Sequence, residues 1–152
     1  MKEKDTHIAN KLFKQFLKER GLSFTRQRKV ILEQIFRDHD HFEAEEIVGA
    51  LRNRKIRVSR ATVYRTLSCL ENCNLIRRID LGHGHSHFEH TLGHTHHEHL
   101  YCKKCGKIIE FTDAALEERI GTISKLNHFV VLTHTVQIFG LCKDCNIKLK
   151  KR

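Results

Sequence analysis

The sequence predicts an α+β protein with two domains, a helical domain at residues 1–90 that ends in a β-hairpin and a small α/β domain at residues 91–152. Three observations predict this division. Apolar residues recur at helical spacing through the first part, whereas short alternating segments and two Cys-x-x-Cys pairs occupy the second. The character of the chain changes near residue 90 without a proline-rich or serine-rich linker. A chain of 152 residues is also long enough to bury a hydrophobic core.

The composition indicates a globular protein of the cytoplasm. Hydrophobic residues make up 39% of the chain, and no apolar run has membrane-spanning length. Residues 1–5 do not lead into the apolar core of a signal peptide, so we expect neither secretion nor a membrane partner. Because cytoplasmic thiols stay reduced, six cysteines that include two Cys-x-x-Cys pairs favour metal binding over disulfides.

Positive charge is concentrated in the first half of the chain. Residues 1–82 carry 18 Lys and Arg against 11 Asp and Glu, whereas residues 83–152 carry 10 against 7. Four of those ten cations lie in the C-terminal tail, at Lys148, Lys150, Lys151 and Arg152. A basic first half joined to a nearly neutral second half favours a nucleic-acid-binding domain attached to a sensor. The alternative is ordinary solubilising charge.

Apolar stripes predict the first two helices. Residues 8–19 carry one stripe, and Gly21 ends that helix. Thr25 is placed to cap a second helix, which has an apolar stripe of its own. The exposed face of the second helix is basic, with Arg26, Arg28 and Lys29.

The next two helices have the spacing of a helix-turn-helix. A turn at residues 38–41 precedes a third helix from Glu43 to about Asn53. Ser59 is placed to cap a fourth helix, which runs to Cys73 and follows the third after a short link, as a recognition helix does. Its apolar stripe is Val63, Leu67 and Leu70, and the side chains off the stripe are Arg60, Tyr64 and Arg65.

A β-hairpin follows the helices. Residues 75–80 and a return strand through residues 87–89 flank a glycine-containing turn at residues 82–84. Helices followed by such a hairpin form a winged helix, a DNA-binding fold. A generic small helical domain would explain the apolar stripes but not the basic outward faces.

Two further groups of metal-ligand residues lie in this first part and just after it. Cys69 and Cys73 have the i, i+4 spacing of a ligand pair, but such cysteines are more often small core residues, and we expect them to pack in the core. Five histidines lie in and after the hairpin, at His83, His85, His87, His90 and His94. Alternation on a strand would present three imidazoles to a metal ion; a solvated histidine-rich wing is the other interpretation.

The second domain is predicted to contain four short strands and one helix. The strands are His99–Cys102, Lys107–Phe111, Phe129–Thr133 and Val136–Leu141. Thr112 or Asp113 is placed to cap the helix, which runs to about Leu126. Its inward side chains are expected to be Leu116, Ile120 and Ile123. Edge strands in such a small sheet favour pairing with a second copy, so we expect a homodimer.

Two Cys-x-x-Cys pairs are the strongest signal in the sequence, and they are Cys102, Cys105, Cys142 and Cys145. Two residues between thiolates let one tight turn direct both sulfurs to one ion, and two such turns give the tetrahedral S₄ site of structural Zn²⁺. The ion would join the first strand of the second domain to its end, across a 36-residue gap. An iron–sulfur cluster uses the same ligands and remains an alternative.

Just before the first Cys-x-x-Cys pair, the chain is rich in histidine. In a strand, His97 and His99 would point to one face and His96 and Glu98 to the other. One strand can therefore supply ligands to two different metal sites. A solvated polar loop is the alternative interpretation.

Two segments resemble the ferric uptake regulator family of bacterial metal-dependent repressors. They are Ser59-Arg-Ala-Thr-Val-Tyr64-Arg65-Thr-Leu and His97-Glu-His99-Leu-Tyr-Cys102-Lys-Lys-Cys105-Gly-Lys-Ile-Ile-Glu110-Phe. The resemblance extends from about Gly21 to Cys145. It implies an N-terminal winged helix-turn-helix, a C-terminal dimerisation domain, and repression by a metal-loaded homodimer bound to double-stranded operator DNA.

The resemblance also implies two sites besides the cysteine site. The regulatory metal would be held by His41, Glu89, His97, His99 and Glu110. A second site would use His96, Glu98, Glu117 and His134, although the family often has Asp in place of Glu98, and this chain has one extra residue between Glu89 and His99. DNA would be contacted by Arg60, Thr62, Tyr64 and Arg65, with the arginines on phosphates and the tyrosine against a thymine methyl.

We therefore predict a repressor of iron-uptake genes with Zn²⁺ as structural ion and Fe²⁺ as regulatory ion, Mn²⁺ and Zn²⁺ being alternatives for the latter. A peroxide sensor of the same family is tied to Asp where this chain has Glu110. A zinc-uptake regulator adds a cysteine to the regulatory site, and none lies between Cys73 and Cys102. A metal-dependent hydrolase needs an open coordination position, and five ligands leave little room for one, so we do not expect an enzyme.

Overall fold

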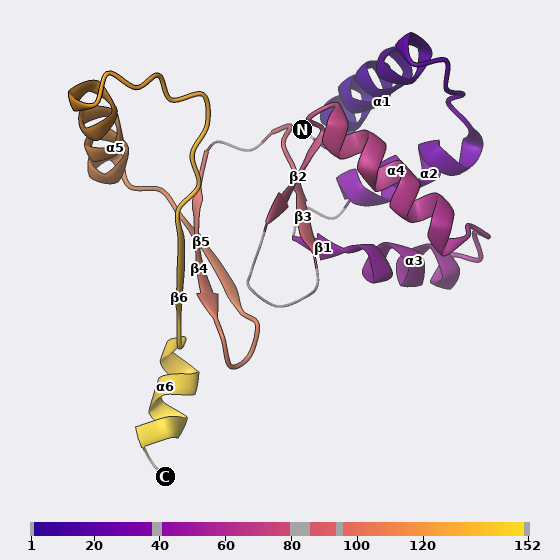
Figure 1. Cartoon of the computed structure of the whole chain (residues 1–152). Helices are drawn as coiled ribbons and strands as arrows, with labels where there is room; N and C mark the ends of the chain where they lie inside the picture. Colours follow the sequence, from indigo (N-terminus) through magenta and orange to yellow (C-terminus); the bar gives the residue numbers. More distant parts are fainter. Residues whose placement is uncertain (1, 38–40, 80–85, 94–95, 151–152) are drawn as a thin grey trace. The chain divides into compact units, whose positions relative to one another are not determined.

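The computed structural model describes residues 2–37, 41–79, 86–93 and 96–150 (Figure 1). The chain divides into two compact units, Met1–His94 and Thr95–Arg152, which we call the first and second unit. The first unit is a winged helix-turn-helix and the second a small α/β unit, so the predicted α+β class is confirmed. No helix among the described residues is long and apolar enough to cross a membrane.

Four helices form the first unit: α1 (Lys2–Glu19), α2 (Arg26–Arg37), α3 (Ala44–Asn53) and α4 (Arg60–Asn72). The predicted N-caps of α2 and α4 are present, because Thr25 Oγ1 accepts the Arg28 N–H at 3.3 Å and Ser59 Oγ accepts the Thr62 N–H at 3.1 Å. Helix α1 begins earlier than the predicted residue 8, because the polar first turns contain good helix formers but no apolar stripe.

The predicted hairpin forms the wing. Strands β2 (Ile76–Ile79) and β3 (His87–His90) pair antiparallel, and the two-residue strand β1 (Phe42–Glu43) adds to β3, giving the order β1-β3-β2. Strand β1 is too short for any period to predict it. Turns were expected at residues 38–41 and 82–84, of which residues 38–40 and 82–84 lie outside the described residues.

One apolar core holds the first unit together. It includes the predicted stripe of α4, Val63, Leu67 and Leu70, together with buried residues of the other three helices and the wing. Cys69 and Cys73 pack against this core, as expected for small hydrophobic side chains. Because the stripe of α4 is buried, Tyr64 lies on the outer side of the helix with 52% of its surface exposed.

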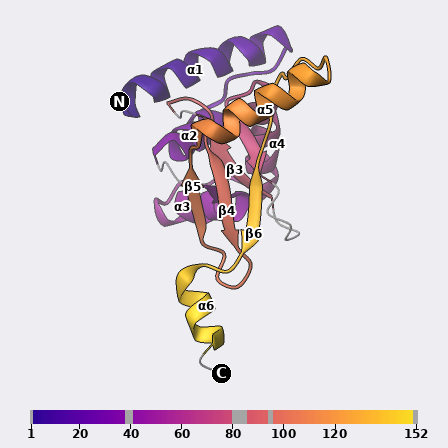
Figure 2. The ribbon, with the colours of Figure 1, turned by 90° about the vertical axis from the view of Figure 1, so that its left-hand side faces the viewer.

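The second unit contains a three-stranded sheet and two helices. Strand β4 (Glu98–Cys102) lies in the centre, antiparallel to β5 (Ile108–Phe111) and parallel to β6 (Gln137–Gly140), and Figure 2 shows the three strands side by side. Helix α5 (Ala114–Leu126) is capped by the Asp113 side chain, which accepts the N–H groups of Ala115 and Leu116. Helix α6 (Lys143–Lys150), which we did not predict, begins directly after Cys142.

Two predictions for the second unit are wrong. Residues 129–133 form no strand, and Ile123 does not face inward, because 48% of its surface is exposed and no residue of α5 is buried. Leu116 and Ile120 are only half-buried. Apolar periodicity indicates that a face will be covered, but it does not indicate whether the cover comes from the same chain.

Candidate metal centres and nucleic-acid surface

The four predicted zinc ligands meet at one end of the second sheet. Cys102 ends β4, Cys105 follows in the next turn, and Cys142 and Cys145 lie at the start of α6. Their sulfur atoms are all within 4.8 Å of one another, and Cys105 Sγ lies 3.7 Å from Cys142 Sγ. Sulfur atoms around tetrahedral zinc lie about 3.8 Å apart, as follows from a Zn–S bond of about 2.3 Å. A disulfide needs only about 2.05 Å, so this group has the dimensions of a metal site.

The backbone favours a thiolate at Cys102, whereas the surroundings of Cys145 oppose one. The Cys142 N–H donates to Cys102 Sγ at 3.3 Å, and this hydrogen bond lowers the pKa of Cys102 to about 6. Burial and the neighbouring thiols raise the pKa of Cys145 to about 12. Four thiolates therefore coexist only around a cation, and zinc binding releases protons and strengthens as pH rises. Gly106 closes the first turn at φ +74°, a conformation that favours glycine.

A second group lies around Glu98, which is almost completely buried in β4. The Nε2 atoms of His96 and His134 lie 2.7 Å and 3.0 Å from the same carboxylate oxygen, Glu98 Oε1. Glu117 of α5 is 3.2 Å from His134. The ligand atoms of these four residues are all within 4.8 Å of one another, so the structure brings the whole predicted second set together. Two imidazoles and two carboxylates suit a divalent transition metal.

Glu98 is fixed and ionised by its surroundings. Burial opposes the charged form, but the Val136 N–H at 2.5 Å and the His96 ring outweigh it and lower the pKa of Glu98. One carboxylate oxygen is thereby held by the backbone next to β6, while the other faces both histidine rings. The two ring nitrogens are 2.9 Å apart, close to the separation of neighbouring ligands on one metal ion with bonds of about 2.1 Å.

The predicted regulatory ligands form one set in each unit. In the first unit, His41 Nε2 lies 3.3 Å from Glu89 Oε2, and both side chains are almost completely buried. In the second unit, the His97 and His99 rings are 4.9 Å apart between centroids, and Glu110 stands opposite His99 in the β4–β5 register. His97 Nε2 lies 3.8 Å from Glu110 Oε1. These mixed nitrogen and oxygen donors suit Fe²⁺, Mn²⁺ or Zn²⁺, and neither set alone fills six coordination positions.

The histidines of the wing have structural contacts where they are described. His87 lies 3.2 Å from Glu43, and His90 stacks on Phe36 while its Nδ1 lies 2.9 Å from the Leu92 carbonyl oxygen. His83, His85 and His94 lie outside the described residues, so both interpretations of these histidines, a three-imidazole site and a solvated wing, stay open.

One residue beside the regulatory set was not predicted. Arg77 stands opposite Glu89 in the β2–β3 register and donates from Nε to Glu89 Oε1. This contact follows from the pairing register of β2 and β3, which could not be predicted from the sequence.

The outer side of α4 and the turn before it are basic. From Arg52 to Leu70 the chain has no Asp or Glu. Ile56 and Val58 pack against the core, whereas the side chain of Arg57 between them is exposed. Lys55 and Arg57 line a cleft beside α3. Within the described residues, four cations of this stretch have neither an ion pair nor a side-chain hydrogen bond: Arg52, Lys55, Arg57 and Arg65.

The remaining predicted DNA-binding residues are partly engaged within the chain. The Arg60 guanidinium lies 3.0 Å from Glu45, although 73% of its side-chain surface is exposed. The Thr62 hydroxyl lies 2.8 Å from the Ser59 hydroxyl at the start of α4. Tyr64 and Arg65 project from the exposed side of the helix, where the edge of a base or a phosphate can reach them.

A winged helix-turn-helix joined to a unit rich in metal ligands defines the class of metal-responsive DNA-binding regulators. Residues 19–139 match the model of the "Ferric uptake regulator family". The chain belongs to this family, whose members are transcriptional regulators.

Three similar proteins illustrate the match. The ferric uptake regulation protein of Campylobacter upsaliensis is 36% identical over 140 residues, covering 91% of this chain and 89% of that protein. The solved structure of the Helicobacter pylori ferric uptake regulator Fur, described as having three functional metal binding sites, has a TM-score of 0.84 at 29% identity and covers 93% of each chain. The peroxide-responsive repressor PerR of Staphylococcus saprophyticus is 34% identical over 133 residues, covering 87% of this chain and 88% of that protein.

Proposed function

We propose that this regulator is a cytoplasmic, homodimeric repressor that binds operator DNA when Fe²⁺ occupies the regulatory ligands. The observation that carries the proposal is the division of those ligands into an incomplete set in each unit. An ion bound by His41 and Glu89 together with His97, His99 and Glu110 would favour one relative orientation of the two units. Metal binding would thereby select the form that fits DNA.

Fe²⁺ is the proposed ion because the similar proteins from Campylobacter and Helicobacter are named for ferric uptake. Affinity alone would favour zinc or copper at mixed imidazole and carboxylate ligands, so selectivity would rest largely on the metal available in the cell. We assign Zn²⁺ to the four cysteines, since S₄ coordination closes a small unit with few other contacts. The Glu98 group is proposed as a second, independent divalent-metal site that joins α5 to the sheet.

Removing a regulatory ligand should abolish the metal response. Fe²⁺ or Mn²⁺ should raise the operator affinity of the wild type at least tenfold under anaerobic conditions, and His97→Ala should no longer respond. His7→Ala, which removes an exposed histidine of α1, is the matched control. Fluorescence anisotropy with labelled operator DNA, at several metal concentrations, measures both affinities. A metal response that survives in His97→Ala would contradict the proposed site.

The same titration separates the iron repressor from its relatives. PerR similarity makes a peroxide sensor the second candidate, but this chain has Glu110 where that branch is tied to Asp. We expect low doses of peroxide to leave operator affinity unchanged and His41, His97 and His99 unoxidised in mass spectra. Rapid loss of DNA binding with oxygen added to His41 or His97 would identify a peroxide sensor. A response to zinc at free concentrations far below those needed for iron would identify a zinc regulator.

DNA binding is proposed to divide between α4 and the turn before it. Tyr64 would contact base edges, whereas Arg65 and the unpaired cations of the turn would neutralise phosphates. Phosphate contacts release counterions, so they determine how steeply affinity falls with salt, and base contacts determine discrimination between sequences. Lys55, at φ 58°, turns the chain so that Arg57 follows on the outer surface.

Single substitutions should separate these two roles. Arg57→Ala and Arg65→Ala should weaken binding to all DNA and reduce the slope of log affinity against log salt by about one each. Tyr64→Ala should leave that slope unchanged and reduce discrimination by about 1–3 kcal/mol at the contacted base. Lys148→Ala removes one positive charge from an exposed position on α6, outside the proposed dimer surface, and is the control. Titrations on operator and random DNA at two salt concentrations measure both the slope and the discrimination. An unchanged slope in both arginine variants would show that this surface does not bind the DNA phosphates.

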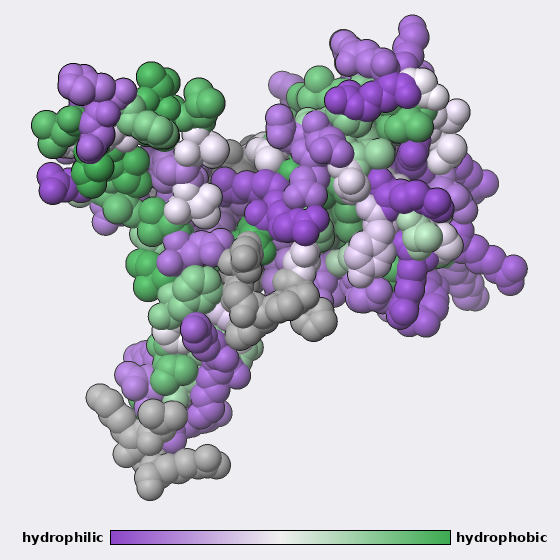
Figure 3. Space-filling view, viewed as in Figure 1, coloured by the Kyte–Doolittle hydropathy of each residue, from purple (hydrophilic) through white to green (hydrophobic). Residues whose placement is uncertain are grey.

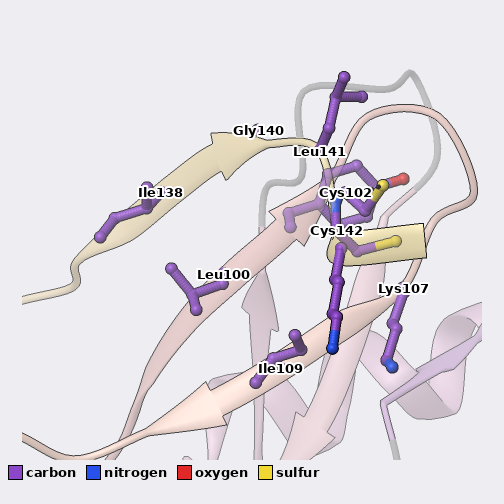
Figure 4. A pocket seen from close by; sticks show the side chains of 10 residues that line it. Leu100, Cys102, Lys107, Ile109, Ile138, Gly140, Leu141 and Cys142 are labelled. Carbon is purple, nitrogen blue, oxygen red and sulfur yellow. Dashed lines mark hydrogen bonds between the residues drawn. The ribbon is translucent and has the colours of Figure 1, made fainter. Parts of the chain in front are cut away.

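The homodimer is proposed from apolar surface in the second unit. Helix α5 and the segment after it expose Leu126, Phe129, Val130 and Leu132, and Figure 3 shows hydrophobic residues gathered over this helix. A second apolar surface lies on the sheet, where Leu100, Ile109 and Ile138 line a hollow (Figure 4). Contiguous exposed apolar surface of this kind marks an interface, and a second copy of the chain would cover it.

A further inference from the structure

Glu89 of the regulatory set has a different partner at each carboxylate oxygen. Oε2 faces His41, the neighbouring regulatory ligand, at 3.3 Å. Oε1 accepts the Nε–H of Arg77, which is the residue directly opposite on the adjacent strand β2. Only 6% of the Glu89 side-chain surface is exposed, against 37% for Arg77. A guanidinium therefore pairs with this buried, proposed metal ligand through the carboxylate oxygen that does not face His41.

The neighbouring arginine of the same strand has a different environment. Successive side chains of a strand alternate between faces, and Arg78 donates to both oxygens of Glu71, at 3.2 Å each. Its guanidinium also lies over the Phe88 ring, 5.4 Å from the centroid. Arg77 and Arg78 are thus two arginines in one strand, each paired with a glutamate, of which only Glu89 belongs to the regulatory set.

We propose that Arg77 is a built-in counter-ion of Glu89 that lowers the affinity of the regulatory site for its metal. The inference rests on the proposed function, because it assumes that Glu89 binds the regulatory ion. Without metal, Arg77 compensates the charge of a buried carboxylate, which would otherwise be costly to bury. The first unit can therefore fold and remain ready for metal in its absence.

When a divalent ion binds, Arg77 opposes it. The ion would take Glu89 Oε2 together with His41, and Arg77 can keep Oε1, so the guanidinium is not displaced. A third positive charge then lies close to the two charges of the ion, in a partly buried setting where screening is weak. The repulsion between Arg77 and the ion exceeds the benefit of the hydrogen bond by which Arg77 orients the Glu89 carboxylate. Arg77 consequently raises the metal concentration at which the repressor responds.

Removing the charge of Arg77 should strengthen metal binding. Arg77→Met, which keeps an unbranched side chain, should lower the dissociation constant for Mn²⁺ at least tenfold, as measured by calorimetric titration of the zinc-loaded full chain. All titrations carry His134→Ala, which removes a ligand of the Glu98 group, so that one site is measured. The metal-free variant should melt at a lower temperature than its parent, and Mn²⁺ should raise its melting temperature by more.

Matched variants separate the possible causes. Arg78→Met removes an arginine from the same strand and should leave the Mn²⁺ dissociation constant unchanged, and Arg77→Lys, which keeps the charge, should stay within about threefold of the parent. The difference between Arg77→Met and its parent should vanish when His41→Ala is added to both. If Arg77→Met folds poorly, Arg77→Gln serves for the same comparison with a polar side chain.

Two results would overturn the proposal. One is a neutral variant at position 77 that binds Mn²⁺ no more tightly than the parent, while His41→Ala still weakens binding. The other is Arg77→Lys binding as tightly as Arg77→Met, since charge would then not be the cause. If instead His41→Ala has no effect on Mn²⁺ binding by the parent, the regulatory site itself is wrong, and the failure belongs to the proposed function.

Discussion

Cys102→Ser is expected to lose the bound zinc and to unfold the second unit. Within the described residues, the buried hydrophobic side chains of this unit are Tyr101, Cys102 and Cys145, so two of the three are cysteines of the proposed zinc site. Structural zinc sites contribute roughly 10–16 kcal/mol of binding free energy, which matches or exceeds the roughly 5–15 kcal/mol that stabilises a whole domain. A sheet with so small a core has little else to hold it together.

Metal analysis, circular dichroism and sedimentation test this expectation together. The wild type should carry about one tightly held zinc per chain, as S₄ coordination requires. Cys73→Ser is the matched control, because this thiol packs on the core of the first unit and should leave zinc content unchanged. A Cys102→Ser protein that remains folded and dimeric with its full zinc content would show that the cysteines are not a structural site.

Leu132→Asp is expected to convert the homodimer into a monomer and to weaken operator binding at least a hundredfold. Leu132 is 93% exposed, and a charge placed there would be desolvated inside the proposed interface. A dimer binds two half-sites of its operator at once, so a monomer loses one half of the contacts. The second unit should keep its zinc, which distinguishes this variant from Cys102→Ser.

Sedimentation equilibrium and operator titration measure the two effects. Leu22→Asp places the same charge at an exposed leucine of the first unit and should leave the dimer intact. A dimeric Leu132→Asp protein would exclude the surface formed by α5 and the segment after it. The hollow on the sheet would then be the remaining candidate for the interface.

Local signals made the first unit predictable from sequence. The boundaries of α2 and α4 follow from Thr25 and Ser59, whose side-chain hydroxyls accept backbone N–H groups at the helix starts. The positions of Val63, Leu67 and Leu70 alone indicate which side of α4 is buried. The four cysteines and the alternation of residues 96–99 were also predictable from local patterns. The other ligands of the two histidine and carboxylate groups were implied only by the family resemblance, and they are His41, Glu89, Glu110, Glu117 and His134.

Features that depend on distant parts of the chain were not predictable. The contact of Arg77 with Glu89 depends on the pairing register of β2 and β3. No residue of the hairpin indicates that register in the sequence. The segment at residues 129–133 has the composition of a strand, yet no described strand pairs with it. Its apolar side chains have the pattern of a covered surface, and sequence cannot tell whether the cover is this chain or another copy.

The parallel pairing of β4 with β6 affects how the molecule is made. The central strand ends at Cys102, but its partner begins only at Gln137, so the sheet cannot close until the intervening residues have been synthesised. At roughly 5–20 residues per second, a ribosome needs about 2–7 s for that stretch. Domains fold N-terminal first, and the winged helix-turn-helix will have left the ribosome by then. We therefore expect each nascent chain to fold its winged helix-turn-helix before the sheet of its second unit can form.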